Sequence, residues 1–228
     1  MVSKLCIIPA RGGSKRIPRK NIKNFLGKPI IAYSIEVALS SGLFDEVMVS
    51  TDDDEIADVA KKYGAKVPFF RSKDNSNDFA TLSDVIDEVK IMYQGVGKEF
   101  DYICCILPTA PFVSTNLLKE SFNKLVETKQ YDSIRPIVRF SYPIQRAFIF
   151  ENSTGLVEYM FPDFKKTRSQ DLEEAYHDAG LFYWMKYKFG LNGDKRGGFI
   201  VSEKIVQDID TLQDWEIAEM KYKILIDM

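Results

Sequence analysis

The chain has 228 residues, with 31 Lys or Arg against 33 Asp or Glu, so its formal net charge is −2 at pH 7. This balance excludes a strongly basic nucleic-acid-binding protein and makes local clusters of charge the informative ones. The apolar fraction of 45% is ordinary for a globular protein and suffices for the core of one substantial domain.

Short apolar runs alternate with amphipathic segments along most of the chain. The apolar runs predict strands at residues 4–9, 46–51, 65–70, 100–108, 131–138, 179–186 and 198–203. The amphipathic segments predict helices at residues 29–42, 53–64, 81–93, 115–128 and 211–226. Asp52 or Asp53 is expected to cap the second helix and Thr115 or Asn116 the fourth, and Gly42 is expected to end the first.

Residues 140–175 interrupt this alternation. They are rich in aromatic residues and prolines, and their alternating apolar positions indicate an irregular β-rich insertion. Elsewhere, strands that alternate with helices predict a Rossmann-like, mainly parallel sheet with helices on both faces. We therefore expect one α/β domain over residues 1–228, with an insertion at about 140–175 that either covers a site or pairs with another subunit.

All three cysteines, Cys6, Cys104 and Cys105, fall in apolar runs that predict buried strands. An odd, clustered and apolar set indicates reduced core thiols rather than disulfides, metal ligands or a nucleophile. The run from Leu5 to Ile8 is too short for a secretory signal, and no apolar stretch approaches the ~20 residues of a membrane span. We expect a cytoplasmic protein with no membrane or nucleic-acid partner.

The first predicted strand leads directly into a basic loop. Its positively charged residues are Arg11, Lys15, Arg16, Arg19 and Lys20. The carboxyl ends of strands face the ligand crevice in doubly wound sheets, so charge at this point is directed at a ligand. Gly12 and Gly13 allow backbone N–H groups to approach an anion closely. A charged loop can simply be solvated, but its place after the first strand and its paired glycines favour a triphosphate site.

A second candidate site lies near the end of the chain, where Asp208 and Asp210 flank Ile209. In extended backbone, residues two apart point to the same side, so both carboxylates can reach one cation. Such oxygen ligands suit Mg²⁺, which takes one or two carboxylates together with phosphate oxygens and water. Alternatively, Asp210 caps the last helix. A phosphate loop elsewhere in the chain favours the metal, because phosphates and Mg²⁺ usually occur together.

Other reactive or aromatic residues give weaker signals. His177 is the only histidine, and a lone His beside an Asp is more often structural than catalytic. The aromatic residues 182–184 are interpreted as core strand rather than as a stacking platform for a ligand. No Ser/His/Asp or Cys/His nucleophile set is evident, so any catalysis is expected to rest on positioning and charge neutralisation.

Several segments together resemble the acylneuraminate, or CMP-nonulosonic acid, cytidylyltransferases. The first motif, IPARGGSKRIPRKN, is highly specific, and the resemblance continues in family order through GKPIIAYSIE, VSTDDDEIADVAKKYGA, ILPTAP, RSQD and DIDTLQDW. YPIQRA and AYHDAG are most similar to the branch that acts on pseudaminic acid. The resemblance implies a Rossmann-like fold, a homodimer, and a Mg²⁺-dependent reaction of CTP with a nine-carbon acid sugar that yields a CMP-sugar and pyrophosphate.

The resemblance also implies roles for individual residues. The implied nucleotide-binding residues are Arg11, Gly12, Gly13, Ser14, Lys20, Asn21, Arg71 and Thr81. The implied sugar-binding residues are Gln145, Arg146, Arg168, Gln170 and His177, with Arg168 at the position of an arginine associated with the sugar. Asp208 and Asp210 match the metal-binding pair. Catalysis is implied for Arg11 and Lys20, through charge on the phosphates, and for Asp210, through the metal.

Three positions depart from the sialic acid branch. Leu107 replaces a polar Gln that contacts the sugar, Ala179 replaces the Asn before Gly180, and His177 stands where a basic residue is frequent. All three changes lie on the presumed sugar side, which favours an altered sugar over a lost activity. The open alternatives are sialic or legionaminic acid as the sugar, a nucleotidyltransferase for a neutral or phosphorylated sugar, and a non-catalytic nucleotide-binding module.

Overall fold

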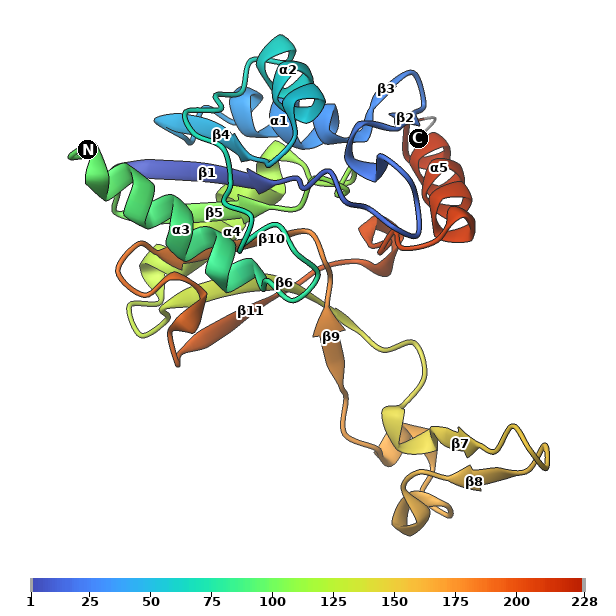
Figure 1. Cartoon of the computed structure of the whole chain (residues 1–228). Coiled ribbons are helices and arrows are strands. Elements are labelled where there is room, and N and C mark those ends of the chain that lie inside the picture. The colour runs from blue at the N-terminus through green and yellow to red at the C-terminus, as the bar shows by residue number, and fades with distance from the viewer. Residues whose placement is uncertain (1, 227–228) are drawn as a thin grey trace.

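A seven-stranded sheet forms the centre of the molecule in a computed structural model that describes residues 2–226 (Figure 1). Its main path has the order β11–β6–β10–β5–β1–β4, and β9 pairs with β6. The strands are β1 (Lys4–Pro9), β4 (Glu46–Ser50), β5 (Tyr102–Ile106), β6 (Ser133–Arg139), β9 (Tyr176–Asp178), β10 (Phe182–Lys186) and β11 (Arg196–Ile200). The pairs β1–β4, β1–β5 and β6–β11 are parallel, which confirms a mainly parallel α/β sheet.

Helices cover both faces of this sheet, as predicted. They are α1 (Ile30–Ser40), α2 (Asp54–Lys62), α3 (Leu82–Gly95), α4 (Thr115–Glu127) and α5 (Leu212–Ile226). Helices α1, α2 and α4 share one buried cluster on one face, and α3 forms a second cluster on the other. Helix α5 packs in a third cluster against the short hairpin of β2 (Asn24–Phe25) and β3 (Lys28–Pro29).

Strand β1 illustrates how the sheet fills its core from both sides. Cys6 and Ile8 enter the cluster of α1 and α4, whereas Leu5 and Ile7 enter the cluster of α3. Successive side chains of a strand point to opposite faces, and both faces of a helix-covered sheet are dry. A continuous apolar run is therefore the pattern that this position requires.

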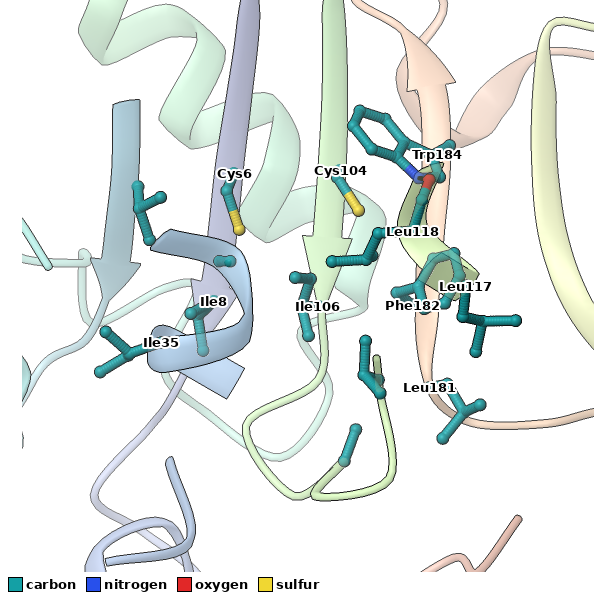
Figure 2. Packing of buried hydrophobic residues seen from close by; sticks show 14 of the residues in the cluster. Cys6, Ile8, Ile35, Cys104, Ile106, Leu117, Leu118, Leu181, Phe182 and Trp184 are labelled. Atoms are coloured by element: carbon teal, nitrogen blue, oxygen red, sulfur yellow. Dashed lines mark hydrogen bonds between the residues drawn. The ribbon is translucent and has the colours of Figure 1, made fainter. Parts of the chain in front are cut away.

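Cys6, Cys104 and Trp184 lie inside the core cluster of α1 and α4 (Figure 2). Cys105 is buried in the cluster of α3 on the other face. The Trp184 indole N–H donates to the Leu118 carbonyl oxygen at 3.2 Å, so its one polar atom is satisfied. Burial raises the pKa of the Cys6 and Cys104 thiols well above the ordinary range and that of Cys105 to about 12. The thiols stay protonated and act as small apolar groups, as predicted.

Two local predictions differ from the structure. Residues 65–70 form no strand, and only Lys66 pairs with Met48 in an isolated bridge. Pro68 has no N–H to donate, so the ladder does not continue there. Helix α4 is capped by Ser114, one residue before the expected positions, whose hydroxyl accepts from the Leu117 N–H at 3.2 Å. The cap of α2 is Asp53, one of its two predicted residues.

Strand β10 runs antiparallel to both of its neighbours, which the alternation of strands and helices does not predict. The chain enters β10 soon after β9, at the edge of the sheet where β5 ends, and Phe182 lies opposite Ile106. A strand that begins at this edge must run back across the sheet. The start of β10 and the ends of β1 and β5 therefore meet at one edge.

Residues 140–175 form an arm that leaves the sheet between β6 and β9 and projects away from the body of the molecule (Figure 1). The arm contains the antiparallel pair β7 (Phe148–Phe150) and β8 (Val157–Tyr159), with the 3₁₀ turns η2 (Ile144–Arg146), η3 (Pro162–Phe164) and η4 (Ser169–Asp171). Its large exposed apolar side chains include Phe148, Ile149, Phe150, Leu156 and Val157. An isolated two-stranded ribbon is marginally stable in water, so this surface favours a covering partner.

Candidate active site

A cavity of about 510 Å³ lies at the carboxyl end of β1. Its walls come from the basic loop, from the segment before α3 and from the loop after β5. Five basic side chains line it: Arg11, Lys15, Arg16, Lys20 and Arg71. Ligands of open α/β sheets bind at this edge. The fold places four of the five basic residues of the predicted triphosphate loop around this cavity, whereas Gly12, Gly13 and Arg19 do not line it.

Arg11 is held by the segment before α3. Its guanidinium donates to the Asn77 carbonyl oxygen at 2.6 Å and pairs with Asp78 at 3.2 Å. Lys15 pairs with the same carboxylate, and the hydrogen bond from Lys15 lowers the pKa of Asp78 below its usual range. Two separate segments of the chain therefore fix the cationic end of this cavity.

The two glycines of the loop differ in what surrounds them. The Gly12 N–H donates to Asp52 Oδ1 at 2.9 Å, and a Cβ at this position would lie 2.6 Å from Asp53 Oδ2. A Cβ at Gly13 would meet nothing within 4 Å. Gly12 is thus required for close packing against the start of α2, while Gly13 leaves open space beside Ser14, which lines the cavity.

Three further predicted nucleotide residues line the same cavity. Asn21 is buried and donates to the Arg11 carbonyl oxygen at 3.0 Å, which ties the two ends of the loop together. Arg71 is buried and donates to the Ser50 hydroxyl at 3.0 Å, and burial lowers its pKa. Thr81 caps α3 through a reciprocal pair with Asp84.

Lys20 connects the basic loop to the acidic pair near the end of the chain. It begins the turn η1 (Lys20–Ile22), and its ammonium donates to the Ile209 carbonyl oxygen at 2.7 Å. The same group lies 3.4 Å from Asp210 Oδ1, and Arg16 pairs with that oxygen at 2.8 Å. Residues 190 positions apart therefore meet at one edge of the cavity.

Asp210 is not the cap of α5, so that alternative is wrong. Thr211 accepts from the Asp214 N–H at 3.2 Å, and the Asp214 carboxylate accepts in return from the Thr211 N–H at 2.7 Å. This reciprocal pair satisfies the start of the helix. Ile209 is buried between Asp208 and Asp210, as the alternating pattern predicts. The Asp210 carboxylate faces the loop cations instead.

A second cavity, of about 650 Å³, adjoins the first through Leu107, which lines both. Its other lining residues include Asp208, His177, Ala179, Gly180, Tyr183 and Lys221. His177 Nδ1 lies 2.9 Å from the Asp178 carbonyl oxygen, and its ring packs on Phe140. The three positions that depart from the sialic acid branch thus lie around one cavity, next to the cavity that the predicted nucleotide residues line.

The remaining predicted sugar residues lie on the arm and do not line either of these cavities. Arg146 donates to the backbone carbonyl oxygens of Lys165 and Thr167, and Arg168 pairs with Asp171 at 2.8 Å. Gln170 lines a smaller cavity of about 300 Å³ at the base of the arm. Gln145 donates to the Glu173 carbonyl oxygen at 3.2 Å, while its own side-chain oxygen is buried without a partner.

Sequence reasoning missed the polar pair of the second cavity. Asp178 Oδ1 accepts from the Gly180 N–H at 2.8 Å and from the Tyr183 hydroxyl at 3.2 Å. Burial, together with Asp178, raises the pKa of Tyr183, so the phenol remains a donor. The alternation of side chains along a strand could have indicated this tyrosine. Phe182 and Trp184 point into one core cluster, and Tyr183, between them, points to the other face.

The mainly parallel sheet and the cation-lined cavity at its carboxyl edge are typical of α/β proteins that bind nucleotides. Residues 5–194 match the family model for cytidylyltransferases. The chain therefore belongs to the cytidylyltransferase family and is a nucleotidyltransferase.

Individual relatives are consistent with this assignment. The chain is 47% identical over 226 residues to a pseudaminic acid cytidylyltransferase of Campylobacter jejuni subsp. jejuni serotype O:23/36 (strain 81-176), with 96% of each chain covered. It is 34% identical over 220 residues to N-acylneuraminate cytidylyltransferase A of Danio rerio, covering 94% of this chain and 50% of that one. A solved CMP:2-keto-3-deoxy-manno-octonic acid synthetase in complex with CTP has the same fold, with a TM-score of 0.70 at 16% identity over 99% of this chain and 100% of that one.

Within residues 2–226, none of the helices combines the length and the apolar character that crossing a membrane requires.

Proposed function

We propose that this protein transfers the cytidylyl group of CTP to pseudaminic acid and releases pyrophosphate. The observation that carries the proposal is the 47% identity to a pseudaminic acid cytidylyltransferase over 96% of both chains. The two adjoining cavities support it, because one is lined by cations that suit a triphosphate and the other is large enough for a sugar. The free, buried cysteines favour the reducing cytoplasm as its place of action.

The proposed reaction is an attack of the sugar's anomeric hydroxyl oxygen on the α-phosphorus of CTP, and the hydroxyl proton is released to water. The bond from the α-phosphorus to the oxygen that bridges it to the β-phosphorus breaks, and pyrophosphate leaves. Protein groups in such a reaction mainly position the reactants and neutralise charge. Arg11 and Lys20 lie where they can donate to phosphate oxygens, and Leu107 lies at the junction of the cavities where the two reactants meet.

Asp208 and Asp210 would hold Mg²⁺ through their carboxylate oxygens, Asp208 from the lining of the second cavity and Asp210 from beside Arg16 and Lys20. Within residues 2–226, no group of three His, Cys, Asp or Glu side chains gathers to hold a metal unaided. Mg²⁺ does not need such a group, because it is commonly bound by one or two carboxylates together with substrate phosphates. When bound, the ion supplies charge neutralisation and a lower pKa for the attacking hydroxyl.

Pyrophosphate release tests this function directly. The protein is incubated with Mg²⁺, each of the four nucleoside triphosphates in turn, and pseudaminic, legionaminic or sialic acid or a neutral sugar. We expect release only with CTP, and fastest with pseudaminic acid. Release with UTP and a neutral or phosphorylated sugar would assign a different nucleotidyltransferase. CTP binding without turnover of any sugar would assign a binding module.

The sugar preference is expected to depend on Leu107. An apolar wall suits pseudaminic acid, which ends in a methyl group where sialic acid carries a hydroxyl. Such a wall rejects an added hydroxyl only weakly, so we expect a preference of about 10–200-fold from this contact. The Leu107 backbone is fixed by hydrogen bonds to Leu181 and Ser34, so Leu107→Gln changes the side chain alone. We expect this variant to narrow the preference, measured as kcat/KM for both sugars, with CTP affinity unchanged.

Leu107→Met is the matched control, because it keeps an apolar side chain of similar volume. It is expected to retain the preference for pseudaminic acid. A wild-type protein that prefers sialic acid would contradict this interpretation of the cavity, although not the transfer of the cytidylyl group.

A homodimer formed through residues 140–175 is the second part of the proposal. The exposed apolar side chains of β7 and β8 favour it, and Phe150 lies opposite Val157 on this ribbon. We expect light scattering to give a dimer at micromolar concentration, and Phe150→Glu combined with Val157→Glu to give a monomer. Asn152→Glu, an exposed polar position beyond β7, is expected to remain dimeric. A fully active wild-type monomer would refute this part.

A further inference from the structure

Arg19 differs from the other basic residues of the loop, because it is directed at the start of α2. Its guanidinium donates through both terminal nitrogens to the Asp53 carboxylate, with 2.8 Å between Nη2 and Oδ1, and it also pairs with Glu55. Arg19 is not among the residues that line the nucleotide cavity. The pair is partly shielded, since the side chains are 38% and 22% exposed. Bidentate pairs of this kind fix geometry as well as charge.

Asp53 also holds two other parts of the structure. Its Oδ1 accepts from the Ile56 N–H at 3.0 Å, which caps α2. Its Oδ2 occupies the space beside Gly12, where a Cβ would come within 2.6 Å. The hydrogen bond from Arg19 lowers the pKa of Asp53 to about 2, so the carboxylate is charged at neutral pH. One side chain thus touches both ends of the basic loop.

The backbone of Arg19 has an unusual conformation. Its φ of 55° lies in the left-handed region, which is unfavourable for an arginine, so surrounding contacts must stabilise it. The Arg19 carbonyl oxygen accepts from the Ile22 and Lys23 N–H groups, both at 3.0 Å. These bonds form the turn that carries Lys20 and Asn21 into the cavity.

We propose that Asp53 is a positioning residue, which holds the basic loop in its nucleotide-binding shape through Arg19 on one side and Gly12 on the other. We call this set the Asp53 clamp. Arg19 then serves the loop and makes no contact with phosphate. This inference rests on the proposed binding of CTP, and it predicts that an acidic residue increases the affinity of the site for a polyanion.

The competing interpretation is that Arg19 is a phosphate ligand and that Asp53 restrains it. The two interpretations predict opposite signs for one variant. Asp53→Asn removes the charge but keeps the helix cap, because Asn caps as well as Asp. Under the clamp, CTP binding weakens because the loop loses its shape. Under the competing interpretation, CTP binding tightens because Arg19 is released.

The test compares wild type, Asp53→Asn, Arg19→Gln and the double variant by calorimetry with CTP and by steady-state kinetics. We expect Asp53→Asn to raise the CTP dissociation constant and KM by about tenfold, as suits the loss of a charge-assisted contact. We expect kcat and the KM for the sugar to stay within about twofold of wild type. The variant is expected to weaken CTP binding equally in the ground state and the transition state, which raises the KM for CTP alone. The double variant is expected to bind CTP no more weakly than whichever single variant has the lower affinity, because both substitutions break the same pair.

Asp54→Asn is the matched control, since it removes an equal charge from the exposed neighbouring position in the first turn of α2. It is expected to leave CTP binding unchanged. Arg19→Lys keeps the positive charge but lacks the two parallel donors of the guanidinium. Its CTP affinity is expected to lie between those of wild type and Arg19→Gln.

Hydrogen exchange without nucleotide separates this inference from the proposed function. We expect the backbone amides of residues 12–17 to exchange faster in Asp53→Asn than in wild type. If wild type bound no CTP, the proposed function would fail, and equal exchange in both proteins would still refute the clamp. If wild type binds CTP, unchanged or tighter binding by Asp53→Asn overturns the clamp whatever the exchange shows.

Discussion

Arg11→Ala is expected to reduce CTP affinity by about two orders of magnitude while the fold stays intact. The guanidinium lines the cavity proposed for CTP, and both of its terminal nitrogens are held by neighbouring groups. Hydrogen bonds to charged groups are each worth about 1.5–3 kcal/mol. The side chain is about one-third exposed (35%), so its loss leaves no cavity in the core. Calorimetry with CTP measures the affinity, and thermal unfolding checks the fold.

Lys15→Ala is compared with Arg11→Ala, because it removes a more exposed positive charge from the same loop. Lys15 pairs with the same Asp78 but is 77% exposed, and contacts of such mobile, solvated groups contribute little. We expect its affinity for CTP to fall only a few-fold. Unchanged affinity in Arg11→Ala, measured beside this variant, would remove the basic loop from the nucleotide site.

Asp210→Asn is expected to reduce turnover about a hundredfold or more at limiting Mg²⁺. Asparagine keeps the shape of the side chain but lacks the charge that a hard cation requires, and metal stabilisation of phosphoryl chemistry is worth several kcal/mol. The helix start is unaffected, because Thr211 and Asp214 cap α5. Pyrophosphate release is measured against Mg²⁺ concentration, and excess EDTA is expected to abolish it in wild type.

Asp214→Asn is the control, because it alters the cap of α5 and leaves the proposed metal ligand Asp210 in place. It weakens the reciprocal cap of α5, so we expect a lower melting temperature with an unchanged Mg²⁺ requirement. If Asp210→Asn turns over normally at limiting Mg²⁺, the metal lies elsewhere.

Most of the fold could be predicted from periodicity, since α2 begins at a predicted cap and the continuous apolar run of β1 is buried on both faces. The direction of a strand could not be predicted in this way. An apolar run such as Phe182–Lys186 carries no information about direction, and β10 runs antiparallel because of the place where the arm returns the chain to the sheet. The failed strand at residues 65–70 shows the limit of apolar composition, because Pro68 cannot join a ladder.

The basic residues that line the cavity at the end of β1 could be picked out from the sequence, but their acidic partners could not. Asp78 lies 67 positions from Arg11, and Asp53 lies 34 from Arg19. In the sequence, Asp53 is only a helix cap and Asp78 is one polar residue among many. That Asp53 both caps α2 and packs beside Gly12 becomes visible only in the folded structure, where the two residues come together.

The pairing of the basic loop with carboxylates has a consequence for how a polyanion arrives. Arg11, Lys15, Arg16, Arg19 and Lys20 all have acidic partners on other segments. At distances beyond about 10 Å, the field of such pairs largely cancels, and salt screens what remains. We therefore expect the loop to attract a polyanion only weakly at long range, despite its many positive charges, and electrostatic steering to contribute little to the association rate. We expect the four loop cations that line the cavity, which exclude Arg19, to act at contact, where phosphate oxygens can replace their carboxylate partners. Discrimination among anions is then expected to appear in the dissociation rate.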